Sequence, residues 1–181
     1  ISPLVEQPEN LQGIMDYYEE YFYESHKEMW INKLGLKEHN ESLINQLIKL
    51  FQRAETDMTI FFRKLANIKE AKIESIADCF YDIDKVPTTE WEEWLGNYLS
   101  LVVPNRSSLM NKHNPKYVFR NWMAQLAIDK AEQGDFSIVN ELYELLKNPY
   151  DEQPEMEEDW YQKRPEWAKN RVGCSMLSCS S

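Results

Sequence analysis

Residues 114–154 read NPKYVFRNWMAQLAIDKAEQGDFSIVNELYELLKNPYDEQP, and the helix-start and helix-stop signals in this stretch decide the fold. Asn114–Pro115 predicts a helix start, because Asn accepts hydrogen bonds from free helical amides and Pro loses no helical hydrogen bond at the first position. We expect this helix to continue to residue 133. Gly134–Asp135 then ends the first helix and caps a second one over residues 136–147. The stretch therefore predicts an antiparallel helical hairpin with a tight corner.

The apolar residues of the hairpin recur at helical spacing, which predicts that each helix has one buried face. The residues expected to point inward are Val118, Phe119, Trp122, Met123 and Leu126 in the first helix, and Ile138, Val139, Leu142, Leu145 and Leu146 in the second. Small side chains at Ala124, Ala127 and Ala131 would allow a neighbouring helix to approach closely.

Three polar residues, Arg120, Asn121 and Gln125, flank the apolar face of the first hairpin helix. A polar group needs a hydrogen-bonding partner wherever it is buried. We therefore expect structural salt bridges or capping contacts at these positions.

The rest of the chain also has apolar residues at helical spacing and lacks strand-like alternation. The sequence therefore predicts an all-α protein, an irregular helical bundle that ends in the antiparallel helical hairpin and a flexible C-terminal tail. The first helix is expected over residues 9–34, ended by Gly35 in the left-handed conformation. Its expected inward face comprises Leu11, Ile14, Met15, Tyr18, Phe22, Ser25 and Met29.

The middle of the chain carries further helix signals. Asn40 is expected to cap a helix that buries Leu43, Ile44, Leu47, Ile48 and Phe51. Another helix is expected from Thr56, and a shorter one within residues 67–87. A helix framed by Pro87 and Pro104 is expected to bury Trp91, Trp94, Leu95, Tyr98 and Val102.

The composition limits the possible partners. At 181 residues, of which 43% are hydrophobic, the chain is long enough for one domain with one core. The formal net charge of -11 disfavours nucleic acid as a partner, because sequence-independent binding depends on clustered Lys and Arg. No apolar run approaches the roughly 20 residues that span a bilayer, so we expect no membrane partner. Because the chain begins with Ile1 and not Met, we expect a piece of a longer protein.

Acidic residues follow the hairpin at Asp151, Glu152, Glu155, Glu157, Glu158 and Asp159. Their spacing lacks the central Gly of a calcium loop, so we expect a solvated linker. The chain is accordingly divided into a helical domain over residues 1–150 and an acidic linker with a Cys-containing tail over residues 151–181.

Catalytic and nucleotide-binding motifs are missing from the sequence. It contains neither of the two Gly-rich phosphate-binding motifs, G-x-G-x-x-G and G-x-x-x-x-G-K-[ST], and it contains no protein-kinase motif. His26, His39 and His113 do not have zinc-protease spacing. We therefore assign no catalytic, cofactor-binding or metal-binding residue to this chain.

The cysteines, Cys79, Cys174 and Cys179, are odd in number and do not form a secreted disulfide framework. Cys174 and Cys179 lack a partner pair or a histidine at metal spacing, which favours a flexible thiol in the tail. A short-range disulfide between Cys174 and Cys179 is a competing prediction.

The segments NPKYVFRNWMAQLAIDKAEQGDFS, NPYDEQP and RPEWAKN, together with the final CSS, resemble the C-terminal end of the selenoprotein O family, and the earlier KEMWINKLGL is similar to it as well. This resemblance implies a kinase-like protein adenylyltransferase that transfers AMP from ATP to Ser, Thr or Tyr hydroxyls of proteins, assisted by Mg²⁺ or Mn²⁺. It also implies that the catalytic residues lie upstream of Ile1. This chain would then be the helical C-terminal part, which packs on the kinase-like lobes of the same polypeptide.

The family's terminal cysteine or selenocysteine matches Cys179, so the resemblance implies a redox role for Cys179. It leaves open whether Cys174 acts as a resolving thiol. For the location, the resemblance implies mitochondria in a eukaryote and the cytoplasm in a bacterium.

A second hypothesis comes from a different class of protein. The chain could be a free-standing helical interaction module whose acidic surface recruits a basic protein partner. A third hypothesis, a thiol oxidoreductase, lacks the C-x-x-C motif and a sheet-based setting. The coding sequence upstream of Ile1 would separate the first hypothesis from the second.

Overall fold

The computed structural model describes residues 8–174, and this part of the chain is built from helices, with backbone pairing limited to isolated bridges and no strand or sheet. The prediction of an all-α protein is confirmed. The α-helices are α1 (Pro8–Leu34), α2 (Glu41–Arg53), α3 (Met58–Leu65), α4 (Thr88–Leu101), α5 (Arg106–His113), α6 (Asn121–Ala131), α7 (Ser137–Lys147), α8 (Glu157–Trp160) and α9 (Glu166–Lys169). Short 3-10 turns are η2 (Ile73–Ser75), η3 (Ala77–Cys79), η4 (Ile83–Lys85) and η5 (Pro154–Met156).

The larger hydrophobic core, called the first core here, lies among α2, α3, α4, α5 and the end of α1. Its centre is aromatic: Trp91 lies 5.5 Å from Phe61 between ring centroids, and Trp94 stacks on Tyr98 at 5.3 Å. Trp94 Nε1 donates to the carbonyl of Leu43 and the Tyr98 hydroxyl donates to that of Leu34, both at 2.9 Å, whereas the buried Nε1 of Trp91 has no hydrogen-bond partner. The predicted buried stripe of α4 is therefore confirmed. In α2 the Asn40 cap is confirmed, whereas Ile48 is exposed.

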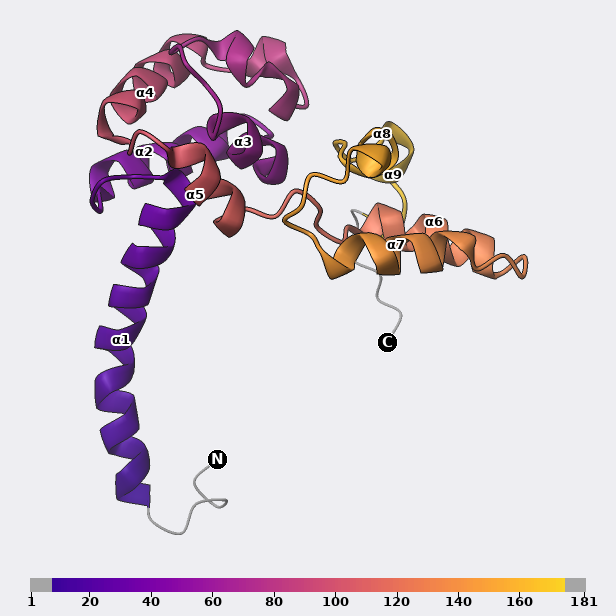
Figure 1. Cartoon of the computed structure of the whole chain (residues 1–181), viewed down its shortest axis with the longest axis horizontal. Helices are drawn as coiled ribbons and strands as arrows, with labels where there is room; N and C mark the ends of the chain where they lie inside the picture. The colour runs from indigo at the N-terminus through magenta and orange to yellow at the C-terminus, as the bar shows by residue number, and fades with distance from the viewer. Residues whose placement is uncertain (1–7, 175–181) are drawn as a thin grey trace.

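Helix α1 has the predicted bounds, and Gly35 ends it with a φ of 64°. The predicted burial of its apolar face is wrong. Figure 1 shows that α1 projects away from the body formed by α2–α5, and the side chains of Ile14 and Tyr18 are 67% and 65% exposed. Helical periodicity indicates which face of a helix is apolar, but no other described element packs along the projecting part of this helix, which is about 40 Å long.

The region between α3 and α4 differs from the prediction. The expected short helix is replaced by η2 and η3, because Ile76 leaves helical geometry with φ −126° and ψ 8°. Its apolar residues are still buried, including Ile73 and Phe80. Helix α3 begins at Met58 after an Asp57 cap, not at Thr56. Helix α5 was missed, since its sequence RSSLMNKH has a single buried residue, Met110.

The predicted helix start at Asn114–Pro115 is wrong, because residues 114–120 are not helical and α6 begins at Asn121. The residue before a proline is pushed toward extended geometry, and Asn114 has φ −124° and ψ 104°. Its amide donates to the carbonyls of Lys33 and Met110, each at 2.8 Å. Asn114 therefore joins α1 to α5.

The hairpin itself is confirmed. Helices α6 and α7 lie side by side in Figure 1. Gly134 turns the corner with φ 81°, and Asp135 Oδ1 accepts from the backbone N–H of Ser137 at 2.9 Å. Of the residues expected inside, Trp122, Met123, Leu142 and Leu145 are buried, whereas Val118, Phe119 and Val139 are exposed.

A smaller hydrophobic cluster, called the second core here, lies between the hairpin and the segment that follows it. The rings of Trp122 in α6 and Trp160 in α8 stack at 5.9 Å between centroids, and Ala168 in α9 is fully buried beside them. The expectation that the acidic side chains of residues 151–159 are solvated is confirmed, whereas the expectation that this segment is a linker is corrected. Apolar side chains that follow the acidic residues fold the acidic segment back onto the hairpin.

Candidate functional site

Charged side chains join the two cores where the segment 114–120 runs from α5 to α6. Arg63, on α3, is buried, and its guanidinium donates to the carbonyls of Asn114 at 3.3 Å and Tyr150 at 3.4 Å. The same guanidinium forms an ion pair with the carboxylate of Glu152. One side chain of α3 thus holds both the start of segment 114–120 and the segment that follows α7.

Lys116 is the other buried cation of this junction. Its Nζ donates to the carbonyl and the carboxylate of Glu152, both at 2.9 Å, and to the carboxylate of Glu157 at 2.8 Å. Burial alone lowers the pKa of Lys116, but the hydrogen bonds to Glu157 and Glu152 outweigh burial and raise this pKa above its ordinary value. Two residues of the acidic run are therefore counterions of a buried lysine, although their own side chains are 63% and 50% exposed.

Arg120 forms the second tie between the cores. Its guanidinium faces the buried carboxylate of Asp57 with two donors, one of them Nη2 to Oδ1 at 2.9 Å. Asp57 Oδ1 also accepts from the backbone N–H of Ile60 at 3.1 Å and so caps α3. The predicted structural salt bridge of Arg120 is confirmed. Gln125 donates to Asp129 within α6 at 2.7 Å, and Asn121 is exposed.

A cavity of about 510 Å³ opens beside this junction, lined in part by Arg63, Lys64 and Lys116. These cations already have partners, since Lys64 pairs with Asp78 at 2.6 Å and the other two pair with Glu152. Three of the cations that line the cavity are therefore already neutralised by carboxylates of this chain. Within residues 8–174 no group of three or more His, Cys, Asp or Glu side chains could hold a metal ion.

The candidate redox residues lie in different settings. Cys174 is a free thiol, buried in the second core, which corrects the expectation that it is a flexible thiol. Cys179 lies outside the described residues, so its redox role stays a prediction. Cys79 is fully buried in the first core, and burial raises the pKa of its thiol far above the ordinary value. Cys79 is therefore a structural residue.

The histidines do not converge on a site. His26 Nε2 accepts from Trp30 Nε1 at 3.0 Å within α1. His39 follows α1 and is half-buried, whereas His113 at the end of α5 is exposed.

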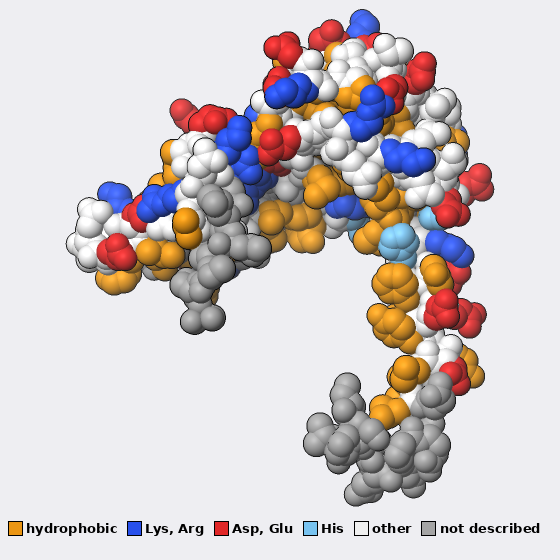
Figure 2. Space-filling model, turned by 180° about the vertical axis from the view of Figure 1, so that it is seen from behind, with side chains coloured by type: hydrophobic (Ala, Val, Ile, Leu, Met, Phe, Trp, Pro, Cys, Tyr) orange, Lys and Arg blue, Asp and Glu red, His pale blue; other side chains and the backbone are white. Residues whose placement is uncertain are grey.

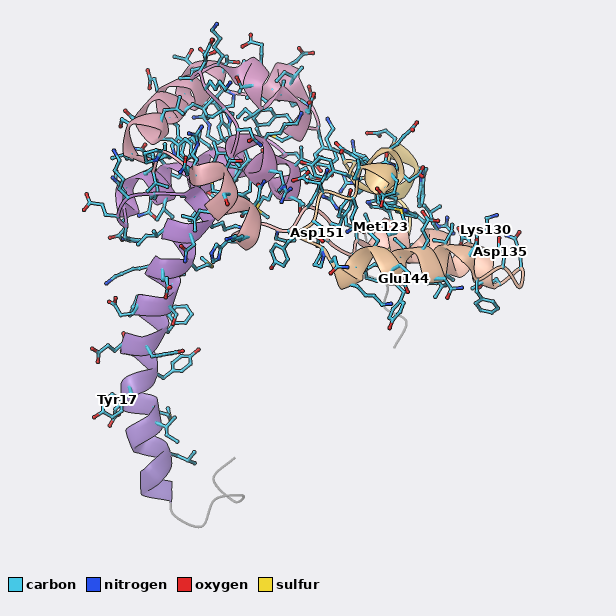
Figure 3. All side chains as sticks on the ribbon, in the orientation of Figure 1. Tyr17, Met123, Lys130, Asp135, Glu144 and Asp151 are labelled. Carbon is cyan, nitrogen blue, oxygen red and sulfur yellow. The ribbon has the colours of Figure 1, made fainter. Side chains whose placement is uncertain are left out.

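The largest unusual feature is an uncovered apolar surface. Figure 2 shows hydrophobic side chains along the side of α1 turned toward the rest of the molecule, beneath the body, and along the lower side of the hairpin. We call the concave space that these side chains border the hollow. The exposed apolar residues of α1 are Ile14, Met15, Tyr17, Tyr18, Tyr21, Phe22, Tyr23 and Met29, of which Tyr17 points away from the hairpin (Figure 3). Apolar surface of this extent marks an interaction site.

Sequence reasoning missed the buried cations Arg63 and Lys116. A signal existed for Arg63, because it lies inside the apolar run MTIFFRKL, where a charge needs a partner when the helix is buried. No local signal identified Glu152 as that partner, since the two residues are 89 positions apart.

These features define a class of protein segment. The buried charges of the junction are satisfied internally, and an extensive apolar surface is left uncovered, which is typical of a helical accessory region that contacts another protein body. Among the described helices, none has the length and apolar character needed to cross a bilayer.

Comparison with known proteins gives the family. Residues 1–147 match the family described as protein adenylyltransferase SelO. The chain is 47% identical to the protein nucleotidyltransferase YdiU of Flavobacterium johnsoniae, an alignment that covers 100% of this chain and 38% of the relative. It is 42% identical to that of Rhodopirellula baltica, again over 100% and 38%, and 41% identical to that of Aromatoleum aromaticum, over 100% and 37%.

The chain belongs to the SelO family, an enzyme family of protein nucleotidyltransferases. The predicted resemblance to selenoprotein O is confirmed. The chain spans about 38% of the length of the curated relatives it matches.

Proposed function

We propose that this chain is the helical C-terminal part of a SelO-type protein adenylyltransferase. The complete protein would transfer AMP from ATP to Ser, Thr or Tyr hydroxyls of protein substrates. The observation that carries this proposal is the family match over residues 1–147, combined with relatives that cover the whole chain with only 38% of their own length.

The kinase-like remainder of the polypeptide is the proposed occupant of the hollow. Support comes from α1, whose exposed aromatic residues form a continuous series: Tyr18 stacks on Phe22 at 6.1 Å, and Phe22 stacks on His26 at 5.8 Å. A stripe of this kind on a projecting helix would bury a large apolar area against a neighbouring body. The role of this chain would then be to brace the catalytic part.

ATP and Mg²⁺ or Mn²⁺ would bind in the remainder of the polypeptide. The residues of this chain do not fit either group, because residues 8–174 offer no cluster of metal ligands and the buried cations Arg63 and Lys116 already have carboxylate partners. No step of the transfer is therefore assigned to side chains of this chain.

The proposal is tested with the full-length protein, ATP labelled at the α-phosphate, Mn²⁺ or Mg²⁺, and a mixture of protein acceptors. We expect label on protein with α-labelled ATP and none with γ-labelled ATP, because AMP transfer retains the α-phosphate and releases pyrophosphate. Label from the γ-phosphate would show phosphoryl transfer and overturn the proposal. Residues 1–181 alone should give no labelled protein, and metal-dependent labelling by this chain would show that catalytic residues lie within it.

We also propose that Cys179 has a redox role. The proposal rests on the family resemblance of the final CSS segment, and the burial of Cys174 disfavours Cys174 as the ready partner of Cys179. Peptide mapping of the oxidised full-length protein without reductant should find Cys179 in a disulfide with a cysteine outside this chain. A Cys174–Cys179 disulfide would support the competing prediction, and a reduced Cys179 under these conditions would contradict both.

A further inference from the structure

A second uncovered apolar feature lies on the hairpin and is distinct from the face of α1. A groove of about 520 Å³ runs between α6 and α7, and we call it the hairpin groove. Its lining residues are Phe119, Ala124, Ala127, Ile128, Ala131, Val139, Leu142, Tyr143 and Leu146. None of these residues carries a charge.

The floor and walls of the hairpin groove have the shape that a helix requires. Ala124, Ala127 and Ala131 recur at helical spacing on α6 and leave its backbone open to close approach. The walls are large side chains that have no cover: Phe119 is 55% exposed and Tyr143 is 64% exposed. Small residues beneath flanking aromatic side chains are typical of a groove that receives the apolar face of a helix.

Charges at the rim of the groove do not recruit a charged partner. Lys130 and Asp135 lie near the tip of the hairpin and pair with each other at 3.5 Å, and Glu144 on α7 pairs with Lys147 at 2.6 Å (Figure 3). Because these charges are satisfied within the hairpin, the apolar lining is the feature that a partner would recognise. The partner chemistry is therefore an apolar helical face and not a charged peptide.

We propose that a helix from the remainder of the same polypeptide packs into the hairpin groove. This inference rests on the proposed function, since it assigns to that remainder a second point of attachment far from α1. The remainder is the best-supported occupant for two reasons. The lower side of the hairpin borders the same hollow as the apolar side of α1 (Figure 2), and 62% of the length of the first relative lies outside the segment that this chain covers.

Two separate attachments have a structural consequence. The first core contacts the remainder through α1, and the second core contacts it through the hairpin groove. The ties made by Arg63 and Arg120 then fix the distance between the two attachments. The chain would then contact the catalytic part at two separate places, α1 and the hairpin groove, and not through a single helix.

The first test is side-chain footprinting of the full-length protein with hydroxyl radicals. Tyr143 is expected to be protected, whereas Tyr150, which is 47% exposed and does not line the groove, serves as the internal reference for each sample. Modification of Tyr143 at the rate of a free surface tyrosine would overturn the proposal.

The second test compares two variants of the full-length protein. Val139→Glu introduces a charge into the groove, and we expect loss of Tyr143 protection together with a lower melting temperature. Asn140→Glu places the same charge on the next residue of α7, which is exposed and outside the groove, and should change neither quantity. Equal behaviour of the two variants would contradict the proposal.

The outcomes separate this inference from its rivals. Protection of Tyr143 that disappears on dilution would identify a second copy of the protein as the occupant and overturn the proposal. AMP transfer by a full-length protein in which Tyr143 is not protected would contradict the inference and leave the proposed function intact. A protected groove in a protein that transfers no AMP would support packing in the groove and contradict the proposed function.

Discussion

The first and second cores show two different ways of holding a small helical body together. The first core buries many large side chains around Phe61, Trp91 and Trp94, and it lies among α2–α5 and the end of α1. The second core has far fewer buried residues, and its hairpin leaves Phe119 and Tyr143 exposed. Apolar burial therefore dominates in the first core. The second core is also held by ion pairs to the first core, and part of its apolar surface is left uncovered.

The difference explains where the buried charges lie. Asp57, Arg63 and Lys116 are buried at the junction. Arg120 and Glu152 satisfy Asp57 and Arg63 across it, and Glu152 and Glu157 satisfy Lys116 on its own side. Breaking a buried pair leaves an uncompensated charge, which costs more than the pair contributes. The junction therefore specifies how the two cores sit, even if its net contribution to the free energy of unfolding is small.

The largest expected effect comes from truncating the first core. Trp91→Ala should lower the free energy of unfolding by about 3–5 kcal/mol, because a fully buried indole is replaced by a cavity. Trp122→Ala in the second core should cost less, since the hairpin can relax toward solvent. Urea denaturation followed by far-UV circular dichroism measures both. Equal losses with one shared transition would show that the cores form a single cooperative unit.

The next largest effect is expected at the junction. Arg120→Met should lower the free energy of unfolding by about 3 kcal/mol, because the buried Asp57 carboxylate loses its partner. Combining Arg120→Met with Asp57→Asn should recover part of this loss, since no charge then remains unpaired. A double-mutant cycle measured by chemical denaturation gives the coupling. Additive losses would show that the pair does not join the cores.

A smaller effect is expected from pH. The folded-state pKa of Lys116 is raised above its ordinary value of 10.5, so its stabilising contribution is fully present below that pH. The contribution is lost as pH rises through the folded-state pKa. Lys116→Arg should remove this alkaline loss, which we expect to be less than about 1 kcal/mol because Glu152 and Glu157 are largely exposed. Melting temperatures of both proteins between neutral and alkaline pH provide the test; identical alkaline profiles would assign the loss to other groups.

The smallest effect is expected on α1 within this chain. Tyr18→Ala should change the free energy of unfolding of residues 1–181 by no more than about 0.5 kcal/mol, because the side chain is exposed. The same change in the full-length protein should be clearly destabilising if α1 packs against the remainder. Thermal unfolding of both forms makes the comparison. A large loss in residues 1–181 alone would show that α1 folds back on this chain.

The sequence by itself determined the all-α class, the bounds of α1, the Asn40 cap, the buried stripe of α4 and the corner at Gly134. Each of these depends on residues close together in the chain, such as a cap and the amides it accepts from, or apolar side chains one turn apart. The family segments were also local strings, and their resemblance was sufficient to indicate the family.

Only the tertiary structure decided which apolar faces are covered and where the charges pair. The face of α1 and the Val139 side of the hairpin look like core in the sequence, yet both are exposed, because periodicity reports an apolar face and not the presence of a partner. Residues 114–120 carry helix-start signals, but contacts of Asn114 with Lys33 and of Tyr117 with Pro149 hold them in another conformation. The pairing of Arg63 with Glu152 joins residues remote in the chain, and nothing in their local sequence specifies a contact that exists only after both cores have folded.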